Sequence, residues 1–171
     1  MSDVVLSSAQ EGVIARIHGL SPGSAMIVSG WAGVGKSICL GEAFKREKGR
    51  MVMCPTGKAA ARLREIGIPA RTIHSQLYRP RERQKGVLDW DLRVDDELPL
   101  NAGDLVFVDE ASMVGPRIAS DLAGLVERVK LRLVLVGDGF QLPPVLSGEE
   151  RAAWGDSFSV MHGDGFESAE R

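Results

Sequence analysis

Three glycines, a lysine and a serine stand close together in the run GWAGVGKS. Gly30, Gly33 and Gly35 allow the backbone to wrap around an anion with its amide hydrogens turned inward. A helix that begins at Gly35 would direct the positive end of its dipole at the same anion. Lys36 supplies a point charge for the outer phosphates of a nucleotide, and Ser37 supplies a hydroxyl for Mg²⁺. The run satisfies G-x-x-x-x-G-K-[ST] in full. Between a predicted strand and a predicted helix, it indicates a site for a nucleoside triphosphate with magnesium rather than a chance glycine-rich turn.

A pair of acidic residues, Asp109 and Glu110, directly follows the apolar run Leu105–Val108. On its own, such a pair is usually no more than the polar end of a strand. Beside a phosphate-binding loop it has a chemical use. Asp109 can hold the magnesium ion directly or through water, and Glu110 can take a proton from an attacking water. The pair therefore favours hydrolysis over nucleotide binding alone.

A third polar group, Gln141, lies in the block GDGFQLPPV that follows another apolar run. A side-chain amide at this place can contact the γ-phosphate and report its loss. The same residues also fit a proline-rich turn that leaves the sheet. Spacing alone does not choose between these two interpretations.

Strands and helices must position these groups, and four short apolar runs without polar alternation predict buried strands. They are Ala25–Val28, Met51–Cys54, Leu105–Val108 and Leu133–Val136. Buried strands separated by helices are typical of a mostly parallel sheet that is covered on both faces. The predicted fold class is therefore α/β, with three layers and the sheet in the middle.

Amphipathic or alanine-rich segments between these strands predict the helices. One begins at about Lys36 and ends in a basic run, with Gly49 as a left-handed C-terminal cap. The next is capped by Thr56 and ends at Gly67, and a third covers about Pro116 to Val129.

Two segments carry weaker patterns. Residues 79–100 are dense in charge and poor in periodicity, and Gln84–Asp91 indicates an exposed turn or hairpin. From about Leu146 onward the pattern fades into Gly, Ser, Asp and Glu, which is typical of a poorly determined tail.

Composition excludes several classes of protein. The chain has 171 residues, of which 44% are hydrophobic and 26% charged, as in an average globular protein rather than a disordered or collagen-like one. A net charge of −2 argues against non-specific binding of nucleic acid through bulk positive charge. Cys39 and Cys54 form no metal-binding or disulfide pattern, which favours reduced thiols in the core. With no leader-like or membrane-spanning apolar run, we expect a soluble, cytoplasmic protein without membrane partners.

Five motifs occur in an order that is typical of one family. They are the phosphate loop GWAGVGKS (a Walker A motif), the segment Cys54–Ala60, the run Thr72–His74, the box Asp109–Val114 and the block Gly137–Val145. Together they resemble the superfamily 1 DNA helicases of the RecD, TraI and Dda type. The resemblance covers roughly Leu6 to Leu146. It implies a RecA-like P-loop ATPase domain at residues 1–146 and a tail at residues 147–171, which could be the truncated start of a further region.

The resemblance also implies roles in binding ATP and Mg²⁺. ATP would be bound by Gln10, Gly30, Ala32, Gly33, Val34, Gly35, Lys36 and Ser37, Mg²⁺ would be held by Ser37 and Asp109, and catalysis would use Lys36, Asp109, Glu110 and Gln141. In this family a glutamine at the place of Gln10 reads the adenine base, although by spacing alone Gln10 would be taken as an exposed helix glutamine.

Single-stranded DNA is the second ligand that the resemblance implies. Its contacts would be Pro55, Thr56, Gly57, Lys58, Thr72 and His74. A helix N-terminus with a nearby lysine can hold a phosphate without base specificity. Taken alone, His74 would more often be a satisfied core or surface histidine. The basic residues Lys58, Arg62, Arg64 and Arg71 equally suit the solvated face of a helix.

The chain departs from the family pattern in three places. Val34 replaces the usual threonine, and Gly139-Phe140 is an unusual filling of its block. After Leu146 no motif matches the second RecA-like domain, which in this family supplies the arginine that stabilises the transition state and half of the DNA track.

The expected function is therefore that of an ATP-dependent DNA helicase motor domain with 5′-to-3′ polarity. Its ATP hydrolysis would be weak or inactive until a second RecA-like domain or subunit is supplied in trans. The alternative is a nucleotide-binding remnant or split subunit that acts as a switch or scaffold without unwinding activity.

Overall fold

The computed structural model of the chain describes residues 5–83, 87–93, 97–141, 144–156 and 158–162. Five strands form one parallel sheet in the order β1-β7-β6-β2-β3. Their bounds are Ser24–Ser29 (β1), Met51–Cys54 (β2), Ala70–Thr72 (β3), Leu105–Val108 (β6) and Arg132–Gly137 (β7). The four strands predicted from apolar runs are confirmed, while the short edge strand β3 was not predicted.

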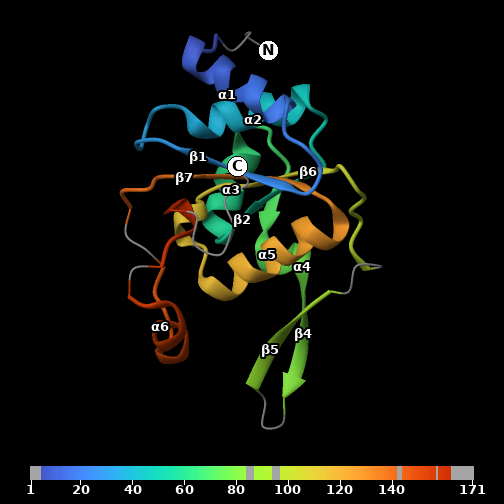
Figure 1. Cartoon of the computed structure of the whole chain (residues 1–171), viewed down its shortest axis with the longest axis vertical. Coiled ribbons are helices and arrows are strands. Elements are labelled where there is room, and N and C mark those ends of the chain that lie inside the picture. The colour runs from blue at the N-terminus through green and yellow to red at the C-terminus, as the bar shows by residue number, and fades with distance from the viewer. Residues whose placement is uncertain (1–4, 84–86, 94–96, 142–143, 157, 163–171) are drawn as a thin grey trace.

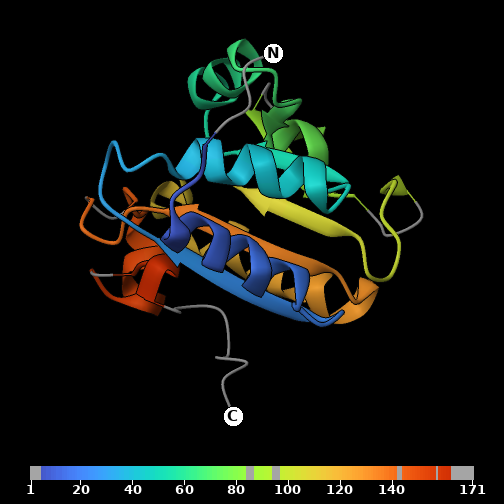
Figure 2. The ribbon, with the colours of Figure 1, turned by 90° about the horizontal axis from the view of Figure 1, so that it is seen from above.

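Helices cover both faces of this sheet. The helices α1 (Ser8–His18), α2 (Lys36–Arg46) and α3 (Gly57–Glu65) pack on one face, and α4 (Ile73–Leu77) and α5 (Pro116–Val129) pack on the other. Figure 1 shows α1 and α2 above the strands and α5 below them, and Figure 2 shows α1 and α2 side by side in front of the sheet. The prediction of a three-layer α/β fold is confirmed.

Burial on both faces explains why the strands lack polar alternation. In the central strand β6, Leu105 and Phe107 join the core beneath α1 to α3, whereas Val106 and Val108 join the core beneath α5. Successive side chains of a strand point to opposite faces, so every position of β6 must be apolar when both faces are covered.

An antiparallel hairpin, β4 (Tyr78–Arg83) and β5 (Val87–Leu92), interrupts the alternation of strands and helices. It projects away from the central sheet (Figure 1). An exposed turn or hairpin was predicted at Gln84–Asp91, and the structure shows a hairpin whose paired segment already begins at Tyr78. Residues 84–86, the first part of the predicted segment, lie outside the described residues.

The end of α2 corrects one prediction. Lys48, and not Gly49, adopts the left-handed conformation, with φ 52°. Gly49 is required for a different reason: a Cβ atom there would lie 2.5 Å from Cδ2 of Phe44 and 3.0 Å from Cε2 of Phe107. The glycine allows a close approach to two aromatic rings rather than an unusual backbone angle.

The other helix limits agree with expectation. Thr56 caps α3, since its hydroxyl accepts a hydrogen bond from the amide of Ala59 at 3.2 Å, and Gly67 is left-handed with φ 84°. The helix α5 has the predicted bounds. Gln10 was expected on a helix whose limits the sequence did not define; this helix is α1, which begins with a capping box between Ser7 and Gln10.

The segment after Leu146 contains ordered structure that the sequence pattern did not reveal. It forms α6 (Gly148–Trp154) and the 3₁₀ turn η3 (Val160–His162). Phe158, Val160 and Met161 are buried in the core beneath α5. The division of the chain at residue 146 stays a prediction.

Two further expectations concern the cysteines and the membrane. Cys39 and Cys54 are both free and buried, and burial raises the pKa of the Cys54 thiol to about 12. Within the described part of the chain, no helix has the length and apolar character needed to cross a bilayer.

The contact at Gly49 yields a stability prediction. Gly49→Ala should lower the free energy of unfolding by about 1–3 kcal/mol, because the added methyl group overpacks the core against Phe44 and Phe107. Urea unfolding followed by circular dichroism measures this change. The matched control is Gly12→Ala in α1, where a Cβ meets nothing within 4 Å and stability should rise by up to about 1 kcal/mol. A Gly49→Ala protein as stable as the wild type would contradict the packing described here.

Candidate active site

The predicted functional residues gather at one edge of the sheet. All five strands are parallel, so their carboxyl ends lie together, and each end leads into a predicted site segment. Across the sheet these segments are the phosphate loop after β1, the Gln141 loop after β7, Asp109 and Glu110 after β6, Pro55–Lys58 after β2, and Thr72 with His74 at the end of β3. The nucleotide residues therefore occupy one half of the edge and the expected DNA contacts the other half.

The phosphate loop has the backbone that its glycines predict. Gly33 and Gly35 are left-handed, with φ 82° and 81°, and Gly35 is the N-cap of α2. The ammonium group of Lys36 donates hydrogen bonds to the carbonyl oxygens of Gly30 and Trp31 at 2.6 and 2.8 Å. These contacts hold the positive charge inside the loop.

Ser37 and Asp109 meet although they are 72 residues apart in the chain. The Ser37 hydroxyl donates to Oδ2 of Asp109 at 3.2 Å, and the Glu110 amide donates to Oδ1 at 3.0 Å. Asp109 is only 5% exposed. Burial raises the pKa of its carboxyl above the ordinary value, although both hydrogen bonds and the charge of Lys36 act in the opposite direction.

This pair of groups fits a magnesium ion. Hydroxyl and carboxylate oxygens are the ligands that Mg²⁺ prefers, and the ion commonly takes only one or two protein groups together with phosphate oxygens. A cation beside Asp109 would also offset the cost of burying its charge. Among the described residues, no group of three or more His, Cys, Asp and Glu side chains forms a separate metal site.

Glu110 has an unusual backbone. It is a half-buried non-glycine residue in the left-handed region, with φ 55° and ψ 39°. Such conformations cost free energy and are concentrated at functional sites. This conformation turns the chain away from the direction of β6 immediately after the buried Asp109.

Gln141 is held by residues that sequence reasoning did not select. The hydroxyl of Ser112, which is 2% exposed, donates to Oε1 of Gln141 at 3.2 Å. Asp138 is also buried; its Oδ1 accepts from the amide of Phe140 at 3.0 Å, and its carbonyl accepts from the amide of Gln141 at 3.1 Å. Asp138 directly follows β7, and Ser112 lies in the 3₁₀ turn η2 (Ala111–Met113) after β6. Both belong to the family-like motifs Gly137–Val145 and Asp109–Val114, so their polarity within these motifs was the available signal.

Gln10 lies against the phosphate loop. Its Nε2 atom donates to the carbonyl of Val34 at 3.3 Å, and its Oε1 atom accepts from the amide of Ser7 at 2.9 Å. A Cβ atom on Gly35 would lie 2.8 Å from Nε2 of Gln10. The structure thus brings Gln10 to the predicted nucleotide residues. Ala32 and Val34 are exposed on the loop.

The expected DNA contacts lie on the neighbouring strands β2 and β3, where Cys54 pairs with Thr72. The hydroxyl of Thr56 caps α3, and that of Thr72 caps α4 by accepting from the amide of Ser75 at 3.2 Å. Lys58 and Gly57 are exposed in the first turn of α3, and Pro55 is half-buried before it. Two helix N-termini therefore open at adjacent strand ends.

His74 lies at the base of the hairpin. Its half-buried ring has centroid distances of 5.3 Å to Tyr78 and 5.6 Å to Trp90. Trp90 was not selected from the sequence, because its proximity to His74 depends on the pairing of β4 with β5. Of the flanking basic residues, Lys58, Arg62 and Arg71 are exposed, and Arg64 donates to the carbonyl of Ala70 at 2.8 Å.

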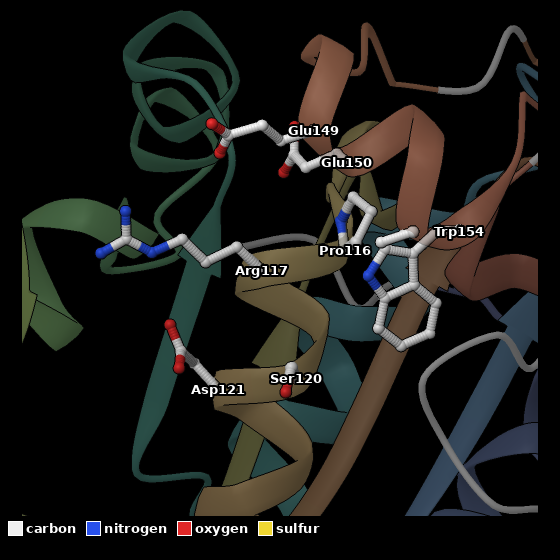
Figure 3. A pocket seen from close by; sticks show the side chains of 8 residues that line it. Pro116, Arg117, Ser120, Asp121, Glu149, Glu150 and Trp154 are labelled. Atoms are coloured by element: carbon white, nitrogen blue, oxygen red, sulfur yellow. The ribbon is translucent and has the colours of Figure 1, made fainter.

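A cavity of about 340 Å³ lies elsewhere, between α5 and α6. Figure 3 shows the side chain of Trp154, from α6, beside Pro116 at the start of α5, and the Arg117 side chain extending away from them. None of its lining residues belongs to the predicted site. The candidate site is therefore the open edge of the sheet and not this cavity.

Comparison with known proteins identifies the family. Residues 5–154 match the family described as an AAA domain. The chain belongs to this AAA domain family. The match covers α1, the whole sheet and α6.

Two curated relatives show which branch of the family the chain resembles. The ATP-dependent RecD2 DNA helicase of Deinococcus radiodurans is 35% identical over 84% of this chain, and the ATP-dependent DNA helicase Pif1 of Campylobacter jejuni is 28% identical over 78%. This AAA domain chain spans only 19% and 32% of their respective lengths. The resemblance to superfamily 1 helicases is confirmed.

A solved structure supports the same fold. The Pif1 helicase from Bacteroides, in complex with ADP-AlF3 and ssDNA, matches with a TM-score of 0.63 and 24% identity. The match covers 88% of this chain and 36% of that one. The chain therefore has a RecA-like α/β fold.

The buried carboxylate yields a prediction about stability. Because the pKa of Asp109 is raised on folding, the folded state binds more protons than the unfolded state between the two pKa values, and stability falls as the pH rises through that range. Asp109→Asn removes this cost and should raise the urea midpoint at pH 7. The difference in urea midpoint between this variant and the wild type should narrow as the pH falls to about 4, because the wild-type carboxyl then becomes protonated in the folded state.

The control for this experiment is Asp156→Asn, which changes an exposed carboxylate paired with Arg151 and should shift the midpoint little. Millimolar Mg²⁺ should stabilise the wild type more than the Asp109→Asn protein. A midpoint that Asp109→Asn leaves unchanged at every pH would show that the buried charge carries no such cost.

Proposed function

We propose that this chain is the first RecA-like motor domain of an ATP-dependent DNA helicase, which binds and hydrolyses Mg-ATP and contacts single-stranded DNA. The hydrogen bond between Ser37 and Asp109 carries the proposal. It joins the phosphate loop to the acidic pair at the central strand, which is the arrangement that magnesium-dependent phosphoryl transfer requires.

Each nucleotide residue has a physical role in this proposal. When ATP binds, the Lys36 ammonium group leaves the carbonyls of Gly30 and Trp31 and binds the outer phosphates. The loop amides and the N-terminus of α2 bind the other phosphate oxygens. Magnesium, held by Ser37 and Asp109, would neutralise charge on the phosphates. Glu110 accepts a proton from the attacking water, and Gln141 contacts the γ-phosphate. Gln10 reads the adenine beside the loop.

The neighbouring half of the edge would hold the DNA. The N-termini of α3 and α4 and the exposed Lys58 provide a line of phosphate contacts without base specificity. His74, with Trp90 beside it, adds an aromatic group at the end of this line. The structure of Bacteroides Pif1 with ADP-AlF3 and ssDNA supports a motor domain that holds both ligands.

The relatives extend well beyond the length of this chain, so the complete motor is part of the proposal. A second RecA-like domain, in cis or in trans, would supply the arginine finger and the other half of the DNA track, and translocation would run 5′ to 3′. Lack of that arginine costs about 10³-fold or more in rate. Weak hydrolysis by the 171-residue chain is the expected consequence. We also propose a cytoplasmic location, which suits the two free thiols.

The ATP part of the proposal is tested with two variants. Lys36→Ala should abolish binding of Mg-ATP, because the phosphates lose their main side-chain cation. Glu110→Gln should keep binding but lower turnover by about 10²–10⁴-fold, the usual contribution of a general base. Calorimetric titration and single-turnover hydrolysis measure the two effects. Unchanged DNA-stimulated turnover in Lys36→Ala would refute the assignment.

The DNA part is tested with charge-matched variants. Lys58→Ala and His74→Ala should each weaken binding of a single-stranded oligonucleotide, and Lys58→Ala should also reduce its salt dependence, because one phosphate contact is lost. Arg16→Ala, which removes an exposed charge in the last turn of α1, serves as the control and should have little effect. Fluorescence anisotropy, with and without an ATP analogue, measures the affinities.

A chain that binds nucleotide but shows no DNA affinity and no coupling between the ligands would contradict the motor. That result would instead indicate a nucleotide-binding switch or scaffold.

A further inference from the structure

Two exposed aromatic rings stack on each other at the nucleotide half of the edge. The ring centroids of Trp31 and Phe140 are 4.5 Å apart, and the ring planes differ by 4°. Trp31 is 63% exposed and Phe140 is 76% exposed, so the stack leaves most of both residues in water. A pair this exposed buries too little area to be explained as part of the core.

The stack joins two catalytic loops. Trp31 belongs to the phosphate loop that carries Lys36, and Phe140 directly precedes Gln141. We propose that Trp31 and Phe140 are positioning residues, which couple the phosphate loop to Gln141 through their stacked rings. This inference rests on the proposed function. In it, a γ-phosphate bound in the phosphate loop shifts the position of Gln141 through the Trp31–Phe140 stack.

The Trp31 end of the link is tied to the catalytic lysine. The carbonyl of Trp31 accepts a hydrogen bond from the ammonium group of Lys36 at 2.8 Å. A phosphate that draws this ammonium group away releases the carbonyl. The backbone that positions the Trp31 ring therefore responds to the occupant of the loop.

The Phe140 end of the link is tied to Gln141. The amides of Phe140 and Gln141 donate to Asp138, at 3.0 Å to its side chain and 3.1 Å to its carbonyl. Because Asp138 is buried, the start of this turn is held in place. The backbone of Phe140 therefore determines the position of the adjacent Gln141. The Gln141 side chain then accepts from Ser112 at 3.2 Å.

The roots of both loops are already in contact. The amide of Gly30 donates to the carbonyl of Gly137 at 3.2 Å, and the amide of Gly139 donates to the hydroxyl of Ser29 at 3.3 Å. The parallel pairing of β1 with β7 produces these contacts, since Ser29 lies opposite Gly137. The aromatic stack extends the link outward from the strand ends to the exposed parts of the loops.

The test compares the affinities of the full chain for Mg-ADP and Mg-ATPγS, which differ in the γ-position. The measured quantity is the dissociation constant for Mg-ADP divided by that for Mg-ATPγS. Gln141→Ala should lower this ratio, because the contact with the γ-phosphate is lost. Phe140→Ala and Trp31→Ala should lower it by about fivefold or more, the lower end of typical coupling. Phe140→Ala should leave the dissociation constant for Mg-ADP within about twofold, the scale of a few tenths of a kcal/mol. Trp31→Phe keeps an aromatic face and should restore the ratio.

A control and a direct probe accompany these variants. Val145→Ala removes another exposed apolar side chain, which is 98% exposed, and should not change the ratio. In a Trp90→Phe, Trp154→Phe background, Trp31 is the only tryptophan of the chain. Its emission should change on Phe140→Leu without nucleotide, because the stack is lost.

The outcomes separate the inference from the proposed function. If Gln141→Ala lowers the ratio while Phe140→Ala and Trp31→Ala do not, the inference is overturned and the proposed function stands. A Phe140→Ala protein that loses Mg-ADP affinity would also overturn it, because the damage would then lie in the phosphate loop itself. A wild-type chain that binds neither nucleotide would refute the proposed function and the inference with it.

Discussion

Parallel pairing of five strands is the constraint on which the rest of this molecule depends. In a parallel sheet every strand enters from the same side, so all the connecting helices return on the faces and all the loops at the carboxyl edge are neighbours. Segments as distant in the chain as Ser37 and Asp109 are thereby brought within hydrogen-bonding distance. The order of the strands then divides the edge, with β6 and its two acidic residues at the centre. In a different strand order, the phosphate loop or the expected DNA contacts would lie farther from that acidic pair.

The same edge concentrates features that are unfavourable for stability. A carboxylate is buried at Asp109, Glu110 adopts a left-handed backbone, and large apolar rings stand in water at Trp31 and Phe140. Away from this edge the molecule is conventional, with apolar strands between two layers of helices. Left-handed non-glycine residues also occur elsewhere, at Lys48 and Lys130, but Glu110 directly follows a buried carboxylate. A strained backbone and a buried charge side by side are typical of a site maintained for function at some cost in folding free energy.

Much of this arrangement could be predicted because local residue patterns determine it. The strands are apolar on both faces, and the phosphate loop needs its glycines for the backbone angles seen at Gly33 and Gly35. What could not be predicted depends on packing between distant segments. Gly49 was assigned a cap because glycine commonly ends helices, whereas its neighbours Phe44 and Phe107 come from two different elements. The stack of Trp31 on Phe140 likewise requires knowledge that β1 and β7 are adjacent.

The turn η3 has a consequence for the limits of the folded unit. A Cβ atom on Gly137 would lie 2.8 Å from the sulfur of Met161, so Met161 packs directly beneath the start of the Gln141 loop. If the protein were shortened after Leu146, the Gln141 loop would lose its packing against Met161. The core beneath α5 would also lose Phe158 and Val160. When this domain is transferred into another protein, the transferred piece must therefore extend at least to Met161 if the Gln141 loop is to keep this support.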